Sequence, residues 1–199
     1  MTEHARPAAK KKVPWWAVVL IVVVVVALVL FVALRALASS LIPHEVTSVR
    51  DYPETAEKWD PQEQVLPRQV PAAATSVRFS SMEPFLQGGG WAQISYVLPQ
   101  ADFDAAEADI ESKAKGAYWS TDSDETIEAV RWQVCGKEDT DDHHSMGAGL
   151  FWHFGTTYAW PEGYRIFLYD DTCTSNHWTS YGAAVNEQTH EVVYAIESW

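Results

Sequence analysis

The residues best suited to metal or acid–base chemistry lie in one short stretch, GKEDTDDHHSM, at residues 136–146. It contains three aspartates, one glutamate and two adjacent histidines. Zinc and calcium sites are built from carboxylates and imidazoles of this kind. The stretch therefore has two interpretations, a metal or catalytic site and a solvated acidic loop.

The spacing within this stretch favours the loop. In an extended segment, neighbouring side chains point to opposite faces, so His143 could act only with Asp141, and His144 only with Asp142. Because a zinc site needs three converging protein ligands, a distant residue such as His153 would have to complete either set. Neither H-E-x-x-H spacing nor a twelve-residue calcium loop occurs here. We predict an exposed loop without a high-affinity metal, and the remaining metal candidates are Asp141, His143, His144 and His153.

No other stretch supplies a reaction. The chain has no G-x-S-x-G motif, and QGGGW lacks the Lys-Ser/Thr pair of a phosphate loop. His153 alternates with aromatic residues in LFWHF, which predicts a partly buried histidine with one hydrogen-bond partner. We predict no catalytic residue, no cofactor and no enzyme. The alternative is a small surface hydrolase or metal-dependent enzyme in which loop 139–144 converges with His153 or His177.

The elements that would position any site begin with a membrane helix. Residues 13–34 carry no charge and, as a helix, would span about 33 Å, the thickness of a bilayer's hydrocarbon core. Trp15 and Trp16 lie where an interfacial aromatic belt is expected. We predict a transmembrane helix over residues 13–35. The alternative is a cleaved signal peptide, because ALA at 36–38 resembles a cleavage site, but the apolar run is longer than a signal core.

Charge predicts the orientation and excludes one class of partner. The tail 1–12 is basic, whereas the few basic residues just beyond the helix are matched by acids, so the tail should be cytoplasmic and residues 36–199 outside a cell membrane that is crossed once. From residue 36 onward the chain has nine Lys or Arg against 26 Asp or Glu, a formal charge of −17. So acidic a region repels phosphate backbones, and nucleic acid is therefore excluded as a partner.

The two cysteines, Cys135 and Cys173, both belong to the exported part of this topology. In an oxidising compartment they are expected to pair. A disulfide closing a loop of this length would contribute about 4 kcal/mol in the chain-entropy account.

The rest of the chain is predicted to form a stalk and one α+β domain. Residues 36–71 are rich in proline and mixed charge, which is typical of an extended stalk or of a segment that wraps an edge. In the domain, 72–199, the runs TSVRFSS and WAQISYVLP read as a hairpin. The stretch ADFDAAEADIESKAKG reads as a helix over 102–115, with Gly116 as its cap. Residues 122–135 fit a helix slightly better than a strand.

Four later runs are strand-like: GLFWHFG, GYRIFLYDD, HWTSYGAAV and EVVYAIESW. The last two form a predicted hairpin. Strands gathered at the end of the chain, with one or two helices before them, predict a small, mainly antiparallel sheet covered by those helices.

Aromatic residues are the feature of the exported part that most suggests a function. It contains eight tryptophans and eight tyrosines, which suit protein interfaces and sugar-stacking platforms. If one face of the sheet packs under a helix, the other should present Phe167 or Tyr169 together with Trp178 or Tyr181. The sequence therefore predicts a membrane-anchored extracytoplasmic binding or interaction module whose ligand is a cell-surface protein or a glycan.

Overall fold

The computed structural model describes residues 14–41, 45–60, 65–84, 89–136, 150–155, 157–171 and 179–198. The chain divides into two compact units, Met1–Ile42 and Pro43–Trp199. In the first unit, helix α1 (Trp15–Leu41) contains the stretch Trp15–Arg35, which is long and apolar enough to cross a membrane and has no side chain buried. A membrane anchor and a signal sequence both fit this helix.

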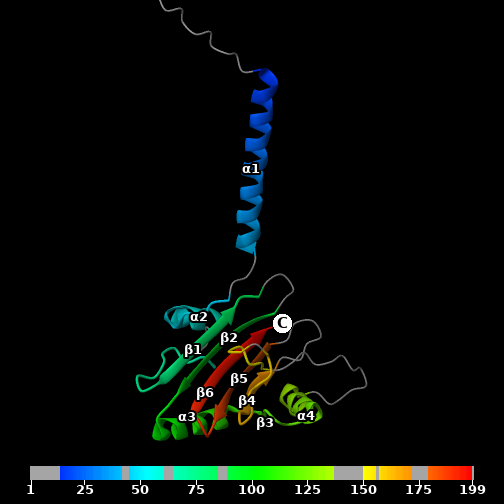
Figure 1. Ribbon diagram of the computed structural model, residues 1–199. Helices are drawn as coiled ribbons and strands as arrows, with labels where there is room; N and C mark the ends of the chain where they lie inside the picture. Colours follow the sequence, from blue (N-terminus) through cyan, green and yellow to red (C-terminus); the bar gives the residue numbers. More distant parts are fainter. Residues whose placement is uncertain are drawn as a thin grey trace, which may run out of the picture. The chain divides into compact units, whose positions relative to one another are not determined.

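The second unit is an α+β fold around one antiparallel sheet (Figure 1). Within the described residues the sheet has six strands in the order β1-β2-β6-β5-β4-β3. The strands are β1 (Thr75–Met82), β2 (Gly90–Val97), β3 (Gly116–Trp119), β4 (Arg165–Asp171), β5 (Thr179–Asn186) and β6 (Glu191–Ser198). The helical elements are η1 (Val49–Asp51), α2 (Tyr52–Trp59), α3 (Gln100–Lys113) and α4 (Asp124–Cys135). The predicted α+β class is therefore confirmed.

Both predicted hairpins form, and they pair with each other through β2 and β6. β1 pairs with β2, β5 pairs with β6, and β2 then pairs with β6. In the β5–β6 turn, the side-chain oxygen of Asn186 accepts from the backbone N–H groups of Gln188 and Thr189. This Asx-type turn favours the observed register of the hairpin.

One face of the sheet, face A, carries the larger apolar cluster. Phe103 and Ile110 of α3 are both fully buried in this cluster, as the period of the predicted 102–115 helix requires. The sheet contributes the side chains that alternate toward this face, which include Phe79, Ile94, Tyr96, Phe167, Val185, Val192, Tyr194 and Ile196.

The prediction of an extended stalk over residues 36–71 is wrong for the part of it that belongs to the second unit. Val46 pairs with Ser81 at the edge of β1, and Tyr52 and Ala56 of α2 are buried in the face A cluster. Asp60 is also buried, and its carboxylate accepts from two backbone N–H groups of the following turn. The alternative interpretation, a segment that wraps an edge, is the one observed. Apolar side chains between the prolines make the difference, because they have a core to enter.

The opposite face, face B, is covered by α4 and by residues 150–155 and 157–164. Residues 150–155 were predicted as a strand, but they form a loop. Two of their backbone donors bond to side chains on the sheet, the N–H of Phe151 to Glu197 and the N–H of His153 to Gln93, and the N–H of Trp152 donates to the carbonyl of Tyr158. The alternation of this run therefore reflects burial against the sheet, with Leu150 and Trp152 in the face B cluster.

Residues 122–135 form a helix, as the sequence slightly favoured. Its N-cap is Ser123, whose hydroxyl accepts from the N–H of Thr126. Gly136 ends the helix in the left-handed conformation with φ at 64°. Gly116, expected to cap the preceding helix, instead begins β3, an edge strand that the sequence analysis missed.

The middle of β5 has no room for a side chain on face B, and this gives the first prediction. A Cβ at Gly182 would lie 2.1 Å from the carbonyl oxygen of Phe167 and 2.7 Å from Leu150. We expect Gly182→Ala to lower the free energy of unfolding by about 2 kcal/mol, in the range of overpacked cores. The measurement is denaturant unfolding of the full chain in detergent, followed by tryptophan fluorescence.

The matched control is Gly136→Ala, where the new Cβ meets nothing within 4 Å but φ is positive. That substitution should cost only about 1 kcal/mol, through backbone strain alone. Equal losses in the two variants would show that β5 and the covering loop do not pack as closely as described.

Candidate binding site at the edge of β1

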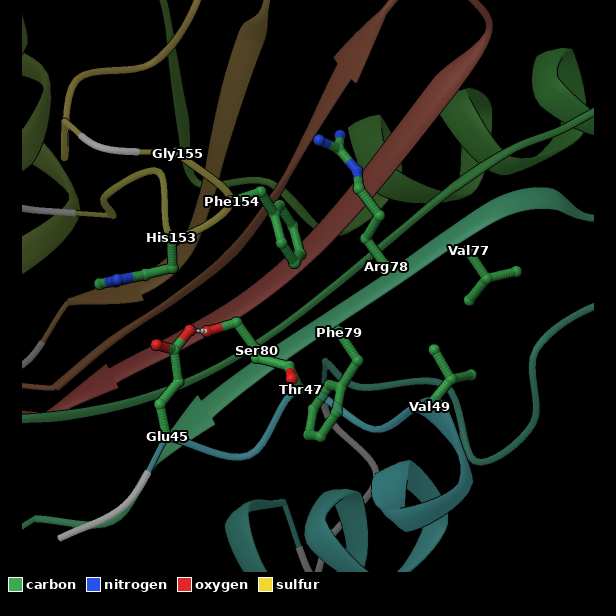
Figure 2. A pocket seen from close by; sticks show the side chains of 10 residues that line it. All are labelled: Glu45, Thr47, Val49, Val77, Arg78, Phe79, Ser80, His153, Phe154 and Gly155. Atoms are coloured by element: carbon green, nitrogen blue, oxygen red, sulfur yellow. Dashed lines mark hydrogen bonds between the residues drawn. The ribbon is translucent and has the colours of Figure 1, made fainter.

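A pocket of about 570 Å³ lies along the outer edge of β1. Ligand sites of small molecules commonly have volumes of this order. Figure 2 shows the segment 45–49 on one side of β1 and residues 153–155 of the covering loop on the other. The walls are partly apolar, from Val49, Val77, Phe79 and Phe154, and the polar groups belong to Glu45, Thr47, Arg78, Ser80 and His153.

A chain of hydrogen bonds fixes the carboxylate of Glu45 in this pocket. The Ser80 hydroxyl donates to Glu45 at 2.8 Å and accepts from the indole N–H of Trp91, also at 2.8 Å. Ser80 and Trp91 are buried on face B, whereas Glu45 is exposed. The sheet therefore holds an exposed carboxylate in a defined position.

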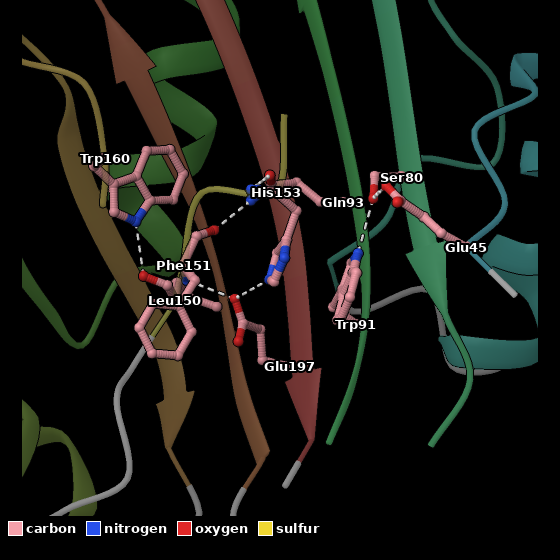
Figure 3. A network of polar contacts seen from close by, with 9 residues as sticks. All are labelled: Glu45, Ser80, Trp91, Gln93, Leu150, Phe151, His153, Trp160 and Glu197. Atoms are coloured by element: carbon pink, nitrogen blue, oxygen red, sulfur yellow. Dashed lines mark hydrogen bonds and ion pairs between the residues drawn. The ribbon is translucent and has the colours of Figure 1, made fainter. Parts of the chain in front are cut away.

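Behind this chain lies a buried network around Glu197 (Figure 3). The Nε2 atom of His153 is 2.9 Å from the Glu197 carboxylate, and the two side chains are 1% and 0% exposed. A carboxylate only accepts, so Nε2 carries the donated proton. The imidazole ring is stacked on Trp91 with a centroid distance of 4.1 Å. The network thus connects the covering loop, β6 and β2 to the Glu45 side of the pocket.

The cation of the pocket, Arg78, is already compensated. Its guanidinium forms an ion pair with Glu191 and donates to Ser95. It also lies 4.9 Å from the ring of Trp152 and 4.7 Å from the ring of Phe154. Burial, and then the hydrogen bond to Glu191, raise the pKa of Tyr164, so its hydroxyl remains a donor to the second carboxylate oxygen.

The charge of Glu45, unlike that of Arg78, has no partner of opposite sign among the described residues. Within the described part of the chain, no Lys, Arg or His forms an ion pair with it, and its carboxylate accepts only the Ser80 bond. Since the Arg78 charge is cancelled by Glu191, the described residues leave one negative charge of the pocket, beside apolar walls, without a compensating cation. This combination is suited to a ligand that has a cationic group next to apolar groups.

His153 does not present a reactive group to this pocket. Its Nε2 is committed to Glu197, one ring face is covered by Trp91, and the buried Nδ1 has no hydrogen-bond partner. The prediction of one hydrogen-bond partner holds for the imidazole, but the predicted partial burial is wrong, because the side chain is only 1% exposed. The residue orients the covering loop; it is not placed to exchange protons with a bound molecule.

The predicted display of aromatic residues on a free face of the sheet is wrong for Phe167 and Tyr169. Both are buried in the face A cluster, at 1% and 8% exposure, and Arg165 lies 4.8 Å over the Phe167 ring. Tyr181 is half-buried against the same cluster, and Trp178 lies outside the described residues. The error has a simple cause: both faces of the sheet are covered, so alternation along β4 separates two cores and not a core from solvent.

Two other predicted sites fall wholly or partly outside the described residues. The loop 139–144, with Asp141, His143 and His144, is outside them, as is His177, so the metal and hydrolase hypotheses there are untested. In the part of the chain that is described, no three His, Cys, Asp or Glu side chains are grouped to hold a metal ion. Cys135 ends α4 and is not a free thiol, but Cys173 lies outside the described residues, and the Cys135–Cys173 bridge stays a prediction.

The sequence analysis missed Glu45, Ser80 and Glu197. Glu45 was assigned to a stalk, and Ser80 and Glu197 were assigned only to the predicted strands TSVRFSS and EVVYAIESW. The alternation in EVVYAIESW gave no signal for Glu197, because a half-buried strand would turn Val192, Tyr194 and Ile196 inward and Glu197 outward. Its burial follows from the cover on both faces of the sheet.

Comparisons with known protein families, with curated proteins and with solved structures gave no match. Any inference about the function of this chain therefore depends on the chemistry of its own residues, above all those of the β1-edge pocket.

The buried pair of His153 and Glu197 gives the second prediction. Glu197→Leu would leave the imidazole and the Phe151 N–H without their acceptor in a dry environment, and we expect a loss of about 3 kcal/mol or more. Glu197→Gln retains an accepting oxygen and should cost less. Denaturant unfolding of the full chain in detergent measures both.

The control is the exposed pair of Lys113 and Asp109, whose side chains are 49% and 54% exposed. Asp109→Asn should change the free energy of unfolding by less than about 1 kcal/mol. If Glu197→Leu were no more destabilising than this control, the network would not hold the covering loop.

Proposed function

We propose that the chain is a single-pass, membrane-anchored binding module whose second unit faces outward and binds its ligand in the β1-edge pocket. The observation that carries this proposal is the fixed, uncompensated carboxylate of Glu45 beside apolar walls. The apolar length of α1 supports the anchor, and the basic tail before it supports the orientation.

The chemistry of the pocket favours recognition over catalysis. Many acid–base mechanisms pair a general acid with a general base at the same bound molecule. Of the candidates in the lining, Arg78 is tied to Glu191 and His153 to Glu197. This leaves Glu45 as a charged contact for a ligand, with Thr47 and Ser80 as hydroxyl neighbours.

The same chemistry favours a protein ligand over a glycan. Stacking on a sugar requires uncovered aromatic faces, and Phe167 and Tyr169, which were expected to supply them, are buried. A lysine or arginine side chain from a partner protein would instead satisfy Glu45, and its apolar neighbours would contact Val49, Val77 and Phe154. The net acidity of this part of the chain would also speed the approach of a basic partner.

The orientation can be tested with lysines that the chain already has. A membrane-impermeant amine reagent applied to intact cells should modify Lys58 and Lys113, whose side chains are 60% and 49% exposed. It should modify Lys10, Lys11 and Lys12 only after the cells are permeabilised. Mass spectrometry of the purified chain gives the modified positions.

Modification of the tail lysines in intact cells would reverse the proposed topology. Recovery of a soluble chain beginning at Ser39 would show that the helix is a removed signal sequence.

The pocket itself can be tested with two probes that share an apolar body and differ in charge. The full chain in nanodiscs of phosphatidylcholine should bind 2-phenylethylamine, and 3-phenylpropionate should bind more weakly or not at all, because Glu45 attracts the ammonium group. Glu45→Gln should weaken amine binding by about tenfold, as expected for loss of a charge-assisted hydrogen bond. Ligand-observed NMR titrations give the dissociation constants.

Glu54→Gln is the matched control, since Glu54 is an exposed carboxylate in the first turn of α2 and does not line the pocket. Equal binding of the two probes, or an equal effect of both substitutions, would contradict the proposal. Binding of a neutral oligosaccharide such as maltotriose with no dependence on Glu45 would favour a glycan ligand instead.

A further inference from the structure

From the backbone beside the pocket we infer that the ligand is an extended, basic peptide segment of a partner protein, which adds to the outer edge of β1 as a short antiparallel strand. The inference rests on the proposed function and specifies the kind of partner. Peptide recognition by strand addition takes its affinity from main-chain hydrogen bonds and its specificity from alternate side chains.

The chain already shows that this edge accepts an antiparallel strand. The N–H of Val46 donates to the carbonyl of Ser81, and the N–H of Ser81 donates to the carbonyl of Val46. The pairing stops there, because the segment turns into η1 three residues later. Among the described residues, Val46 to Ser81 is the isolated bridge on this side of β1.

The open part of the edge begins two residues before this bridge. In an antiparallel ladder, the backbone groups of alternate residues point to the same side of the strand. The pairing of β1 is regular between Arg78 and Met82. Since the backbone N–H and C=O of Ser81 point away from β2, those of Phe79 also point away from β2. No backbone hydrogen bond connects Phe79 to segment 45–49 in the described structure, and Thr47 and Val49 form the far wall of the pocket instead.

The register of such a peptide follows from this geometry. The peptide residue opposite Phe79 would direct its N–H and C=O toward β1 and its side chain toward the face A side, near Val49. The residues before and after it would direct their side chains to the face B side, where Ser80 holds the Glu45 carboxylate. A basic side chain is therefore expected at these flanking positions, and an apolar one between them.

The edge is also protected against longer pairing, which argues against a second copy of this chain as the occupant. Val46 covers one end at Ser81, and at the other end the register of β1 shifts between Thr75 and Arg78, with Ser76 at a positive φ of 52°. Bulges and short open edges prevent extended edge-to-edge association. What remains is one short site, which is suited to a few residues of a peptide.

The test uses the peptide acetyl-Val-Lys-Val-Lys-Val-amide and the full chain in nanodiscs of neutral phosphatidylcholine, which does not itself attract the peptide. Two analogues separate strand addition from simple charge attraction. Methylation of the central valine nitrogen removes the N–H that should face Phe79, and we expect binding to weaken by about tenfold. Methylation of the backbone nitrogens of the two lysines alters N–H groups that should face solvent. Binding of this analogue should remain within about threefold of the parent peptide.

Hydrogen exchange gives an independent measurement at the edge. The parent peptide at saturation should slow exchange of the Phe79 amide by about tenfold, and the valine-methylated analogue at the same concentration should slow it less, because it binds more weakly. Exchange at the Ser81 amide, which is already bonded to Val46, should be unchanged. Protection of Phe79 that rises with protein concentration in the absence of peptide would identify a second copy as the occupant and overturn the inference.

Failure of this inference is distinguishable from failure of the proposed function. Equal binding of the two methylated analogues, without protection of Phe79, would exclude strand addition but leave the pocket intact if 2-phenylethylamine still depends on Glu45. Loss of the Glu45 dependence for the amine would remove the proposed function and the inference together. The acidic peptide acetyl-Val-Glu-Val-Glu-Val-amide should not bind, and equal affinity for it would contradict the assigned charge.

Discussion

The carboxylate of Glu197 lies fully buried on face B of the sheet, and the cover of that face depends on satisfying it. A buried carboxylate is tolerated only when donors surround it, and the covering loop supplies them from His153 and the Phe151 backbone. In return, the loop gains acceptors for N–H groups that have no strand partner. One wall of the pocket is therefore held in place by the hydrogen bonds that satisfy a buried carboxylate at the end of β6.

Much of the fold follows from local sequence patterns. The two hairpins, the helix at 100–113 and the helix at 124–135 all carry their own period, caps or turns, and each forms close to its expected position. Local patterns failed where tertiary contacts decide. The Pro-rich segment enters the core through Tyr52 and Ala56, and the strand-like run at 150–155 finds its hydrogen bonds on the sheet surface. Neither outcome can be recognised without knowing what lies opposite.

The candidate site was the least predictable part, for the same reason. Its central contacts connect positions far apart in sequence, such as Glu45 with Ser80 and His153 with Glu197. No spacing rule relates these pairs. The cluster of acids and histidines at 139–144, which the sequence analysis considered first, lies outside the described residues. The sequence did indicate that the exported part is rich in aromatic residues. Most of these rings pack against the two covered faces of the sheet. The alternation along a single strand could not show that both faces are covered.

The short pairing of Val46 with Ser81 also determines how the second unit would respond to mechanical load. A pull along the chain from α1 enters this unit at residues 43–45, so the load reaches the two Val46–Ser81 hydrogen bonds before it reaches the buried residues of α2. Two hydrogen bonds at an edge are a small barrier compared with a packed core. Their rupture would lengthen the tether and also carry Glu45 away from Ser80, so tension would remove the charged wall of the pocket while the rest of the sheet stays folded.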